Sequence, residues 1–180
     1  MKLFTGRGDQ GQTDLYGEYR LEKTDPVFDM LGTLDELNEF VGSAKVLCLG
    51  KPVESILNEI QRDLYQMMAL IAHRYEKEAK FAFGYEKLAF IEAAIEKLTP
   101  AFPVLKEFIT PGANELSNRF GIARTITRRA ERLFLRLDNA GNEKLEYAAK
   151  YLNRLSSLFF AMEVISIDSP DSLNVLERSK

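Results

Sequence analysis

The sequence predicts an all-α protein: a five-helix antiparallel bundle with a Gly-rich N-terminal lead-in, in a single domain of residues 1–180. Five segments carry apolar residues at alternating steps of three and four, which is the pattern of a helix with one buried face. No linker or internal repeat divides the chain. The spacing is close to 3.5 and the connections are short, which favours shallow packing between antiparallel neighbours.

The first two helices are marked by both apolar pattern and start signals. The apolar positions of the first are Val27, Met30, Leu34, Leu37, Val41, Ala44 and Cys48. Asp25 is its expected N-cap and Pro26 its first helical residue. The second helix opens near Pro52, and its apolar positions are Leu57, Ile60, Leu64, Met67 and Ile71.

The remaining three helices follow the same pattern. The third has Leu88, Ile91, Ile95 and Leu98, and ends before Pro100 and Pro103. The fourth follows Pro111-Gly112 and has Leu116, Phe120, Ala123, Thr127, Ala130, Phe134 and Leu137. Asn139-Ala140-Gly141-Asn142 supplies the turn to the fifth, which has Leu145, Ala148, Leu152, Leu155, Phe159, Met162 and Ile165.

Two regions lie outside this pattern. Residues 1–24 form a polar, Gly-rich lead-in with only a short extended start at Leu3-Phe4, and residues 168–180 have no apolar stripe and are expected to form a surface tail. A bundle needs neither region for its core. The lead-in therefore invites a functional interpretation.

Composition narrows the class of protein. The chain is 46% hydrophobic and 28% charged, as is typical of globular proteins, and its formal charge of −3 argues against a general nucleic-acid binder. It has one cysteine, which fits a reducing compartment, and no apolar stretch long enough to span a membrane. A cytoplasmic protein is expected.

The lead-in has the composition of an anion-binding loop. It reads Thr5-Gly6-Arg7-Gly8-Asp9-Gln10-Gly11-Gln12-Thr13-Asp14, with Gly17 and Lys23 beyond. Glycines allow successive backbone N–H groups to face an anion, and arginine and lysine add positive charge. Phosphate is the expected ligand, although the spacing is not that of a P-loop. The alternative is an arm without a binding role.

A second cluster of charge lies on the fourth helix. Arg124, Arg128 and Arg132 share one face, with Glu131 beside them and Arg129 next in the chain. The face borders the apolar stripe, and partly buried guanidinium groups need carboxylates or phosphates as partners. The alternative is a solvated basic face or a set of structural ion pairs.

Three other residues are candidates for the same site. Asp35 borders the core stripe of the first helix, and pairing with Arg124 or Arg128 would satisfy its carboxylate. Asn153, in the fifth helix, could bind a ribose or phosphate or be merely exposed. Phe108 precedes the rigid Pro111-Gly112 turn. From the residues alone, it either points into a pocket or plugs the end of the bundle, and the plug is the simpler interpretation.

Together these segments resemble the PduO-type ATP:cob(I)alamin (corrinoid) adenosyltransferases. The matching segments are Thr5–Thr13, Gly32-Thr33-Leu34-Asp35-Glu36-Leu37-Asn38, Phe108–Gly112, Ala123–Arg132 and Tyr151-Leu152-Asn153-Arg154-Leu155-Ser156. They occur in the family's order and cover residues 3 to about 160. Any one of them could arise by chance, whereas five in order make the resemblance specific.

The resemblance implies transfer of the 5′-deoxyadenosyl group of ATP to the cobalt of cob(I)alamin, with triphosphate as the leaving group and Mg²⁺ as the accompanying ion. It implies ATP binding by Thr5, Gly6, Arg7, Gly8, Thr13, Asp14, Lys23, Arg128, Arg129, Glu131, Arg132 and Asn153. Asp35 and Arg124 would form an ion pair on the corrin side, Phe108 would close the lower face of the corrin, and Asp35, Arg124 and Arg128 would be the catalytic residues. A homotrimer with sites between subunits is implied, with a reductase or an adenosylcobalamin-dependent enzyme as a further partner, and with neither nucleic acid nor membrane.

The chain departs from the family's usual pattern at several positions. Phe120-Gly121-Ile122 stands where Leu-His commonly precedes the Ala-Arg pair, and Glu163 stands where the fifth helix commonly carries Arg. Ser157 replaces a usual Asp, and Glu18-Tyr19 replaces a usual Gly-Glu pair. These differences leave open a non-catalytic binder of ATP or corrinoid, acting as a chaperone or sensor. A ferritin-like di-metal bundle would need two Glu-x-x-His elements, and the chain has one histidine. A purely structural bundle would leave the Arg face and the Gly-rich loop unexplained.

Overall fold

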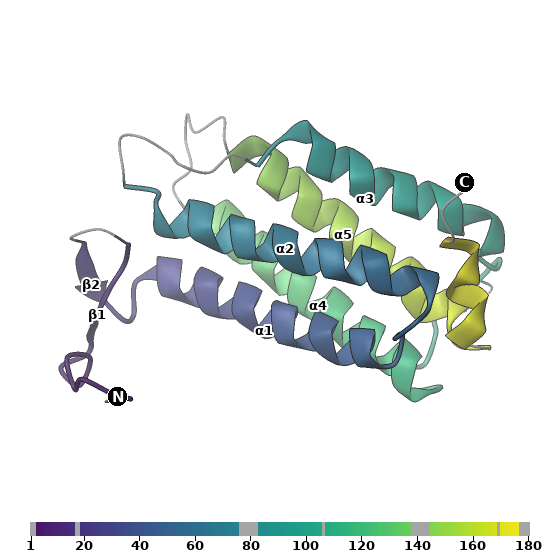
Figure 1. Cartoon of the computed structure of the whole chain (residues 1–180), viewed down its shortest axis with the longest axis horizontal. Helices are drawn as coiled ribbons and strands as arrows, with labels where there is room; N and C mark the ends of the chain where they lie inside the picture. Colours follow the sequence, from purple (N-terminus) through teal and green to yellow (C-terminus); the bar gives the residue numbers. More distant parts are fainter. Residues whose placement is uncertain are drawn as a thin grey trace.

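Five helices account for most of the chain (Figure 1). The computed structural model describes residues 3–16, 19–75, 83–105, 107–137, 145–168 and 170–176. In chain order the elements are β1 (Gln12–Asp14), β2 (Arg20–Glu22), α1 (Pro26–Val46), α2 (Pro52–Ala72), α3 (Tyr85–Leu98), the 3₁₀ helix η1 (Thr99–Ala101), α4 (Glu115–Arg136), α5 (Glu146–Ile165) and the 3₁₀ helix η3 (Pro170–Leu176).

The predicted apolar stripes form the core of the bundle. Every stripe position named for the first, second, fourth and fifth helices is buried, and in α3 only Ile95 is partly exposed. Helix α4 packs between α1 and α5, while α2 packs on α1 and α3 packs on α5. The all-α prediction and the five-helix prediction are confirmed. The turn predicted at residues 139–142 lies outside the described residues.

Helix α1 starts where its cap predicts. The Asp25 carboxylate accepts a hydrogen bond from the backbone N–H of Val27 at 2.9 Å, and Pro26 occupies the first turn, where its missing N–H costs nothing. The start of α1 also fixes where the N-terminal hairpin leaves the bundle (Figure 1).

Replacing Asp25 with alanine is expected to lower the free energy of unfolding by about 1 kcal/mol, because an N–H of the first turn loses its acceptor. Urea denaturation followed by circular dichroism measures the change. Asp25→Asn is the matched control, since asparagine caps a helix about as well. Equal losses in both variants would show that the charge, not the cap, is responsible.

The lead-in differs from the sequence prediction. Strands β1 and β2 pair antiparallel, with Thr13 opposite Leu21, and form a hairpin that the sequence reading did not predict. Leu3 and Phe4, the expected extended start, are exposed and belong to no strand. The hairpin contacts the C-terminal end of α2: the Tyr19 hydroxyl donates to the Tyr75 carbonyl at 3.0 Å. Gly17 and Glu18 lie outside the described residues.

The C-terminal segment also differs from its prediction. Helix η3 contacts α2, α3 and α5, and its Leu173 and Leu176 are buried. Asp171 is exposed and forms an ion pair with Lys51 at 2.8 Å. The expectation of a surface tail is therefore wrong for η3, because two leucines three residues apart are enough to fix a 3₁₀ turn against the core. Among the described residues, no helix has the length and apolar content of a membrane span.

Candidate active site

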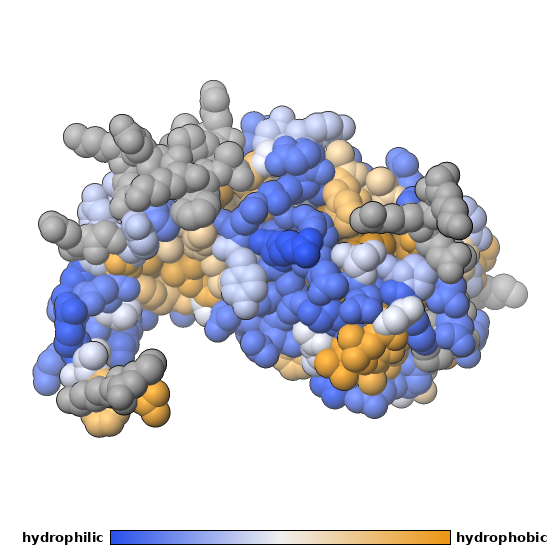
Figure 2. Space-filling view, viewed as in Figure 1, coloured by the Kyte–Doolittle hydropathy of each residue, from blue (hydrophilic) through white to orange (hydrophobic). Residues whose placement is uncertain are grey.

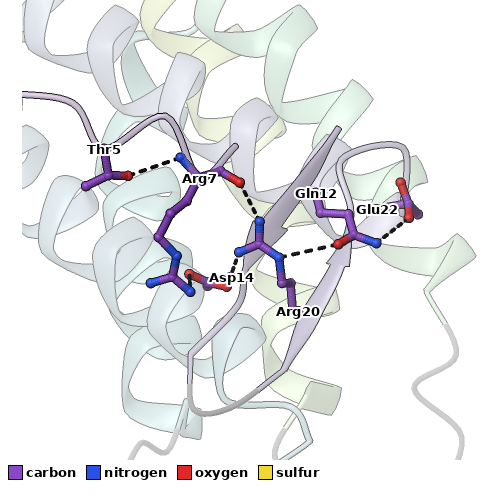
Figure 3. Close-up of polar contacts among 6 residues, drawn as sticks. All are labelled: Thr5, Arg7, Gln12, Asp14, Arg20 and Glu22. Carbon is purple, nitrogen blue, oxygen red and sulfur yellow. Dashed lines mark hydrogen bonds and ion pairs between the residues drawn. The ribbon is translucent and has the colours of Figure 1, made fainter. Parts of the chain in front are cut away.

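Asp14 is one of the two central residues, with Arg20, in the polar contacts of the lead-in (Figure 3). Its carboxylate pairs with Arg7 at 3.2 Å and with Arg20 at 2.7 Å. Arg20 also donates to the backbone carbonyl of Arg7, which ties the N-terminal loop to strand β2. Asp14 thus holds the guanidinium groups of Arg7 and Arg20 close together. Arg20 was not among the site residues predicted from the sequence.

Glycines shape the loop around these charges. Gly6 and Gly11 have φ of 73° and 81°, in the left-handed region that favours glycine. Gly8 lies against Lys23: a Cβ built at Gly8 would be 3.0 Å from the lysine Nζ. The described lead-in therefore contains the cations of Arg7, Arg20 and Lys23 together with the carboxylates of Asp9, Asp14 and Glu22. The guanidinium groups of Arg7 and Arg20 are the donors in this loop that suit a phosphate ligand.

The second cluster lies on the outer face of α4. Arg128 and Arg132 are exposed, and the Arg132 guanidinium donates to the Arg128 carbonyl at 3.0 Å. Neighbouring helices hold the side chains on either side: Arg129 pairs with Glu36 of α1, and Asn153 of α5 donates to Glu131 at 2.8 Å. Arg129 and Glu131, which lie beside the exposed Arg128 and Arg132, are thus held by contacts with the neighbouring helices.

A groove lies between this cluster and α1. It has a volume of about 320 Å³ and is lined by Asp29, Thr33, Arg129, Arg132, Leu133 and Arg136. Three arginines against one aspartate make the groove cationic. Because it meets the first turns of α1, it lies at the same end of the bundle as the lead-in (Figure 1). Arg136 was not among the predicted site residues.

Arg124 does not form the predicted pair. Its Nε donates to Glu163 of α5 at 2.7 Å, and Asp35 is exposed on α1. The prediction of an Asp35–Arg124 ion pair within the chain is therefore wrong. Helix α4 turns Arg124 toward α5, where a buried carboxylate is a stronger attractor than an exposed one because water does not screen it.

Phe108 is fully exposed, so the interpretation that it plugs the bundle end is wrong. It lies in the loop between η1 and α4, at the end of the bundle opposite the lead-in. The α4 face therefore runs from Arg124, nearer the Phe108 loop, to Arg132 and Arg136, nearer the lead-in. This order places an exposed aromatic ring at one end and a concentration of cations at the other.

A different polar cluster lies inside the bundle between α2, α3 and α5. The Asp63 side chain is 1% exposed and pairs with Lys87, and Tyr151 is fully buried beside it. Burial raises the pKa of the Asp63 carboxyl, while hydrogen bonding and attraction from Lys87 lower it. Burial and the Asp63 charge raise the pKa of Tyr151 well above its usual value. The cluster opens onto a groove of about 640 Å³ between α2 and α3, which is lined by both polar and apolar residues. Hydrophilic residues cover the middle of the face shown in Figure 2, with hydrophobic ones on either side of them.

In the described part of the chain, no group of three or more His, Cys, Asp or Glu side chains is placed to hold a metal ion. Mg²⁺ retains several waters in nucleotide sites and takes its other ligands from one or two carboxylates and from phosphate oxygens. Glu131, half-buried beside the exposed arginines, is a carboxylate that fits such a role.

Comparison with known proteins identifies the family to which the chain is similar. The family model described as cobalamin adenosyltransferase matches residues 3–166. A corrinoid adenosyltransferase of Bacillus subtilis (strain 168) is 39% identical over 168 residues, which cover 89% of this chain and 84% of that protein. The PduO corrinoid adenosyltransferase of Citrobacter freundii is 31% identical over 180 residues, and this match covers 99% of this chain but only 53% of that longer protein.

Solved structures show the same fold. A variant of the PduO-type ATP:corrinoid adenosyltransferase from Lactobacillus reuteri, complexed with cobalamin and ATP, has a TM-score of 0.83 and 33% identity, and the match covers 93% of this chain and 94% of that chain. A second variant, complexed with ATP, has a TM-score of 0.76 and 34% identity, with 90% and 92% covered. Fold and sequence thus define a helical-bundle nucleotide-dependent transferase. The chain belongs to the cobalamin adenosyltransferase family, as its sequence predicts.

Proposed function

We propose that this chain transfers the 5′-deoxyadenosyl group of ATP to the cobalt of a reduced corrinoid. Cob(I)alamin supplies the electron pair that forms the cobalt–carbon bond to C5′, and the bond from C5′ to the triphosphate oxygen breaks, so that triphosphate leaves with its electrons. The observation that carries the proposal is the α4 face, with exposed arginines toward the lead-in end and an exposed Phe108 at the other end.

The polyphosphate is assigned to the cationic end of that face. Arg128 and Arg132 supply charge that is in place before the triphosphate leaves, and preorganised charge of this kind lowers the barrier to a step in which negative charge develops. Asn153 and Glu131 are already joined by a hydrogen bond and orient each other. Mg²⁺ would bind phosphate oxygens and water, with Glu131 as its protein carboxylate.

The lead-in is assigned to the same polyphosphate, contributed by a neighbouring subunit of a homotrimer. The hairpin extends beyond the bundle (Figure 1), which suits contact with a second copy. Thr5, Gly6, Arg7, Gly8, Thr13 and Lys23 are the proposed ATP contacts. Asp14 acts by holding Arg7 and Arg20 in place. Asp35, exposed on α1, is assigned to the corrin side without Arg124 as its partner.

The protein is not required to supply a nucleophile. Cys48 is buried in the core, and burial raises the pKa of its thiol to about 11, so it is protonated at neutral pH. The reactive centre belongs to the corrinoid, and the chain contributes placement and electrostatics.

The direct test supplies the purified chain with chemically reduced cobalamin, ATP and Mg²⁺ and follows the absorption spectrum for adenosylcobalamin. Formation of adenosylcobalamin together with triphosphate supports the proposal. Binding of ATP and corrinoid without product would favour the alternative, a non-catalytic binder.

Replacing Phe108 with alanine is expected to leave the KM for ATP largely unchanged while raising the fraction of five-coordinate cobalt. An exposed aromatic ring that packs against the lower corrin face favours the four-coordinate state, and alanine cannot cover that face. Absorption spectroscopy of bound cob(II)alamin measures the two states. Val104→Ala, at an exposed position of the same loop, is the control. An unchanged spectrum in Phe108→Ala would remove Phe108 from the corrin site.

A further inference from the structure

Glu163 is a carboxylate almost completely enclosed by the bundle. Its side chain is 2% exposed, and its Oε2 accepts a hydrogen bond from the Arg124 Nε at 2.7 Å. Arg124 is 25% exposed, so its outer end reaches the surface of α4. A buried acceptor beside a mostly buried donor holds the guanidinium in one orientation more firmly than a surface pair would.

We propose that Glu163 is the positioning residue that sets Arg124 for corrinoid binding in this chain. The inference rests on the proposed function, because it takes Arg124 to face the corrinoid. Glu163, on α5 of the same subunit, is thus the partner of Arg124 that the sequence analysis predicted to be Asp35. It also gives a physical role to a position where the family commonly carries the opposite charge.

Gly121 supplies the space that Glu163 occupies. A Cβ built at Gly121 would lie 2.6 Å from the Glu163 Oε1 and 3.0 Å from its Cδ, so any side chain at this position would require the Glu163 carboxylate to move. Glycine in the middle of a helix costs about 1 kcal/mol relative to alanine, so it calls for a local reason. The two departures from the family pattern, at Gly121 and Glu163, therefore depend on each other. The glycine leaves the space that the Glu163 carboxylate occupies.

The C-terminal end of α5 and the residues just after it also contact the loop that carries Phe108. The Phe160 ring lies 5.7 Å from the Arg124 guanidinium carbon, and Phe160 lies 5.8 Å from Phe102, centroid to centroid. Phe102 begins the loop that carries Phe108. At the other end of this loop, the Asn114 amide donates to the carbonyls of Ser166 and Ile167 at 2.6 and 3.0 Å. Residues 160–167, at the C-terminal end of α5 and just beyond it, thus contact Arg124 and both ends of the Phe108 loop.

The test compares Glu163→Gln with the wild-type chain under steady-state conditions. Glutamine keeps the shape and an acceptor oxygen but removes the charge, so the fold is expected to persist. The KM for cob(I)alamin should rise roughly tenfold, as expected for the loss of one charge-assisted hydrogen bond, while the KM for ATP stays the same. If Glu163 had only a structural role, Glu163→Gln would change the KM values for both cob(I)alamin and ATP, or it would change only the melting temperature.

A second variant moves the carboxylate without removing its charge. Gly121→Ala places a methyl group against Glu163 and should separate it from Arg124, giving the same selective rise in the corrinoid KM. Gly42→Ala is the matched control, because a Cβ there meets only the side-chain amide of Gln61, at 3.3 Å. In an Arg124→Gln background, Glu163→Gln should add nothing further. Independent, fully additive effects would overturn the positioning role.

The outcomes separate the inference from the proposed function. Equilibrium binding of cob(II)alamin, followed by absorption, provides a readout that does not depend on turnover. If the wild type transfers or binds corrinoid and Glu163→Gln is unchanged in corrinoid KM and affinity, the role of Glu163 is overturned while the proposed function stands. A wild type that binds corrinoid without turnover, with selective weakening in Glu163→Gln, supports Glu163 and overturns catalysis. A wild type that neither transfers nor binds overturns both.

Discussion

Replacing Arg128 with alanine is expected to lower the rate of adenosyl transfer by about 10²–10³-fold, because loss of one preorganised charge at a reacting centre typically has this effect. Arg128 is exposed on α4, so its removal leaves the core unchanged. The loss should therefore appear in turnover and not in the melting temperature. Single-turnover formation of adenosylcobalamin measures it.

Arg119→Ala is the matched control for this experiment. Arg119 lies on the same helix and pairs with Glu115 at 3.1 Å, one turn from the start of α4 and away from the cationic groove. The Arg119→Ala variant loses one positive charge, as Arg128→Ala does, and it should keep nearly full activity. If both variants were equally impaired, the effect would come from the overall charge of α4; if Arg128→Ala were fully active, its assigned role would be refuted.

Replacing Lys87 with methionine is expected to destabilise the protein by about 3 kcal/mol at neutral pH, because it leaves the Asp63 carboxylate buried without its partner. The pKa of Asp63 is already raised by burial, and loss of Lys87 raises it further. A folded-state pKa above the unfolded value means that stability is present below the unfolded pKa and lost as pH rises through the folded pKa. The deficit relative to wild type should thus shrink as pH falls toward the unfolded pKa, because a growing fraction of the folded Asp63 carboxyl is then protonated.

Urea denaturation of both proteins near pH 4 and at pH 7 measures this difference. Lys150→Met is the control, since Lys150 pairs with Glu146 on the exposed face of α5 and its loss should leave the midpoint nearly unchanged. An equal deficit at both pH values would attribute the loss to the packing of the lysine stem, not to the buried charge.

The helices could be predicted because their signals are local and redundant. A cap at Asp25, a proline at Pro52 and the apolar spacing all specify the same elements. The family could be predicted because its motifs are short contiguous segments that occur in the family's order. The assignment of individual residues to ATP or corrinoid remains a prediction.

The features that the sequence reading missed depend on partners distant in the chain. The hairpin strands are three residues each and mostly polar, so they carry no alternating apolar pattern, and side-chain pairs such as Arg20–Asp14 accompany their backbone ladder. Spacing along α4 indicated that Arg124 needed a carboxylate or a phosphate as its partner, but not which group supplied it. One available signal was Glu163 itself, a charge inside an apolar run of the fifth helix.

The burial of Leu173 and Leu176 has a consequence for shortened versions of the chain. Helix η3 fills the space where α2 and α3 approach the end of α5, so a polypeptide stopped at Asp168 would leave apolar side chains of all three helices facing water. Such a product would tend to self-associate. Affinity tags are better joined beyond residue 176, and proteolysis within residues 170–176 should weaken the packing of α2 and α3 at this end of the bundle.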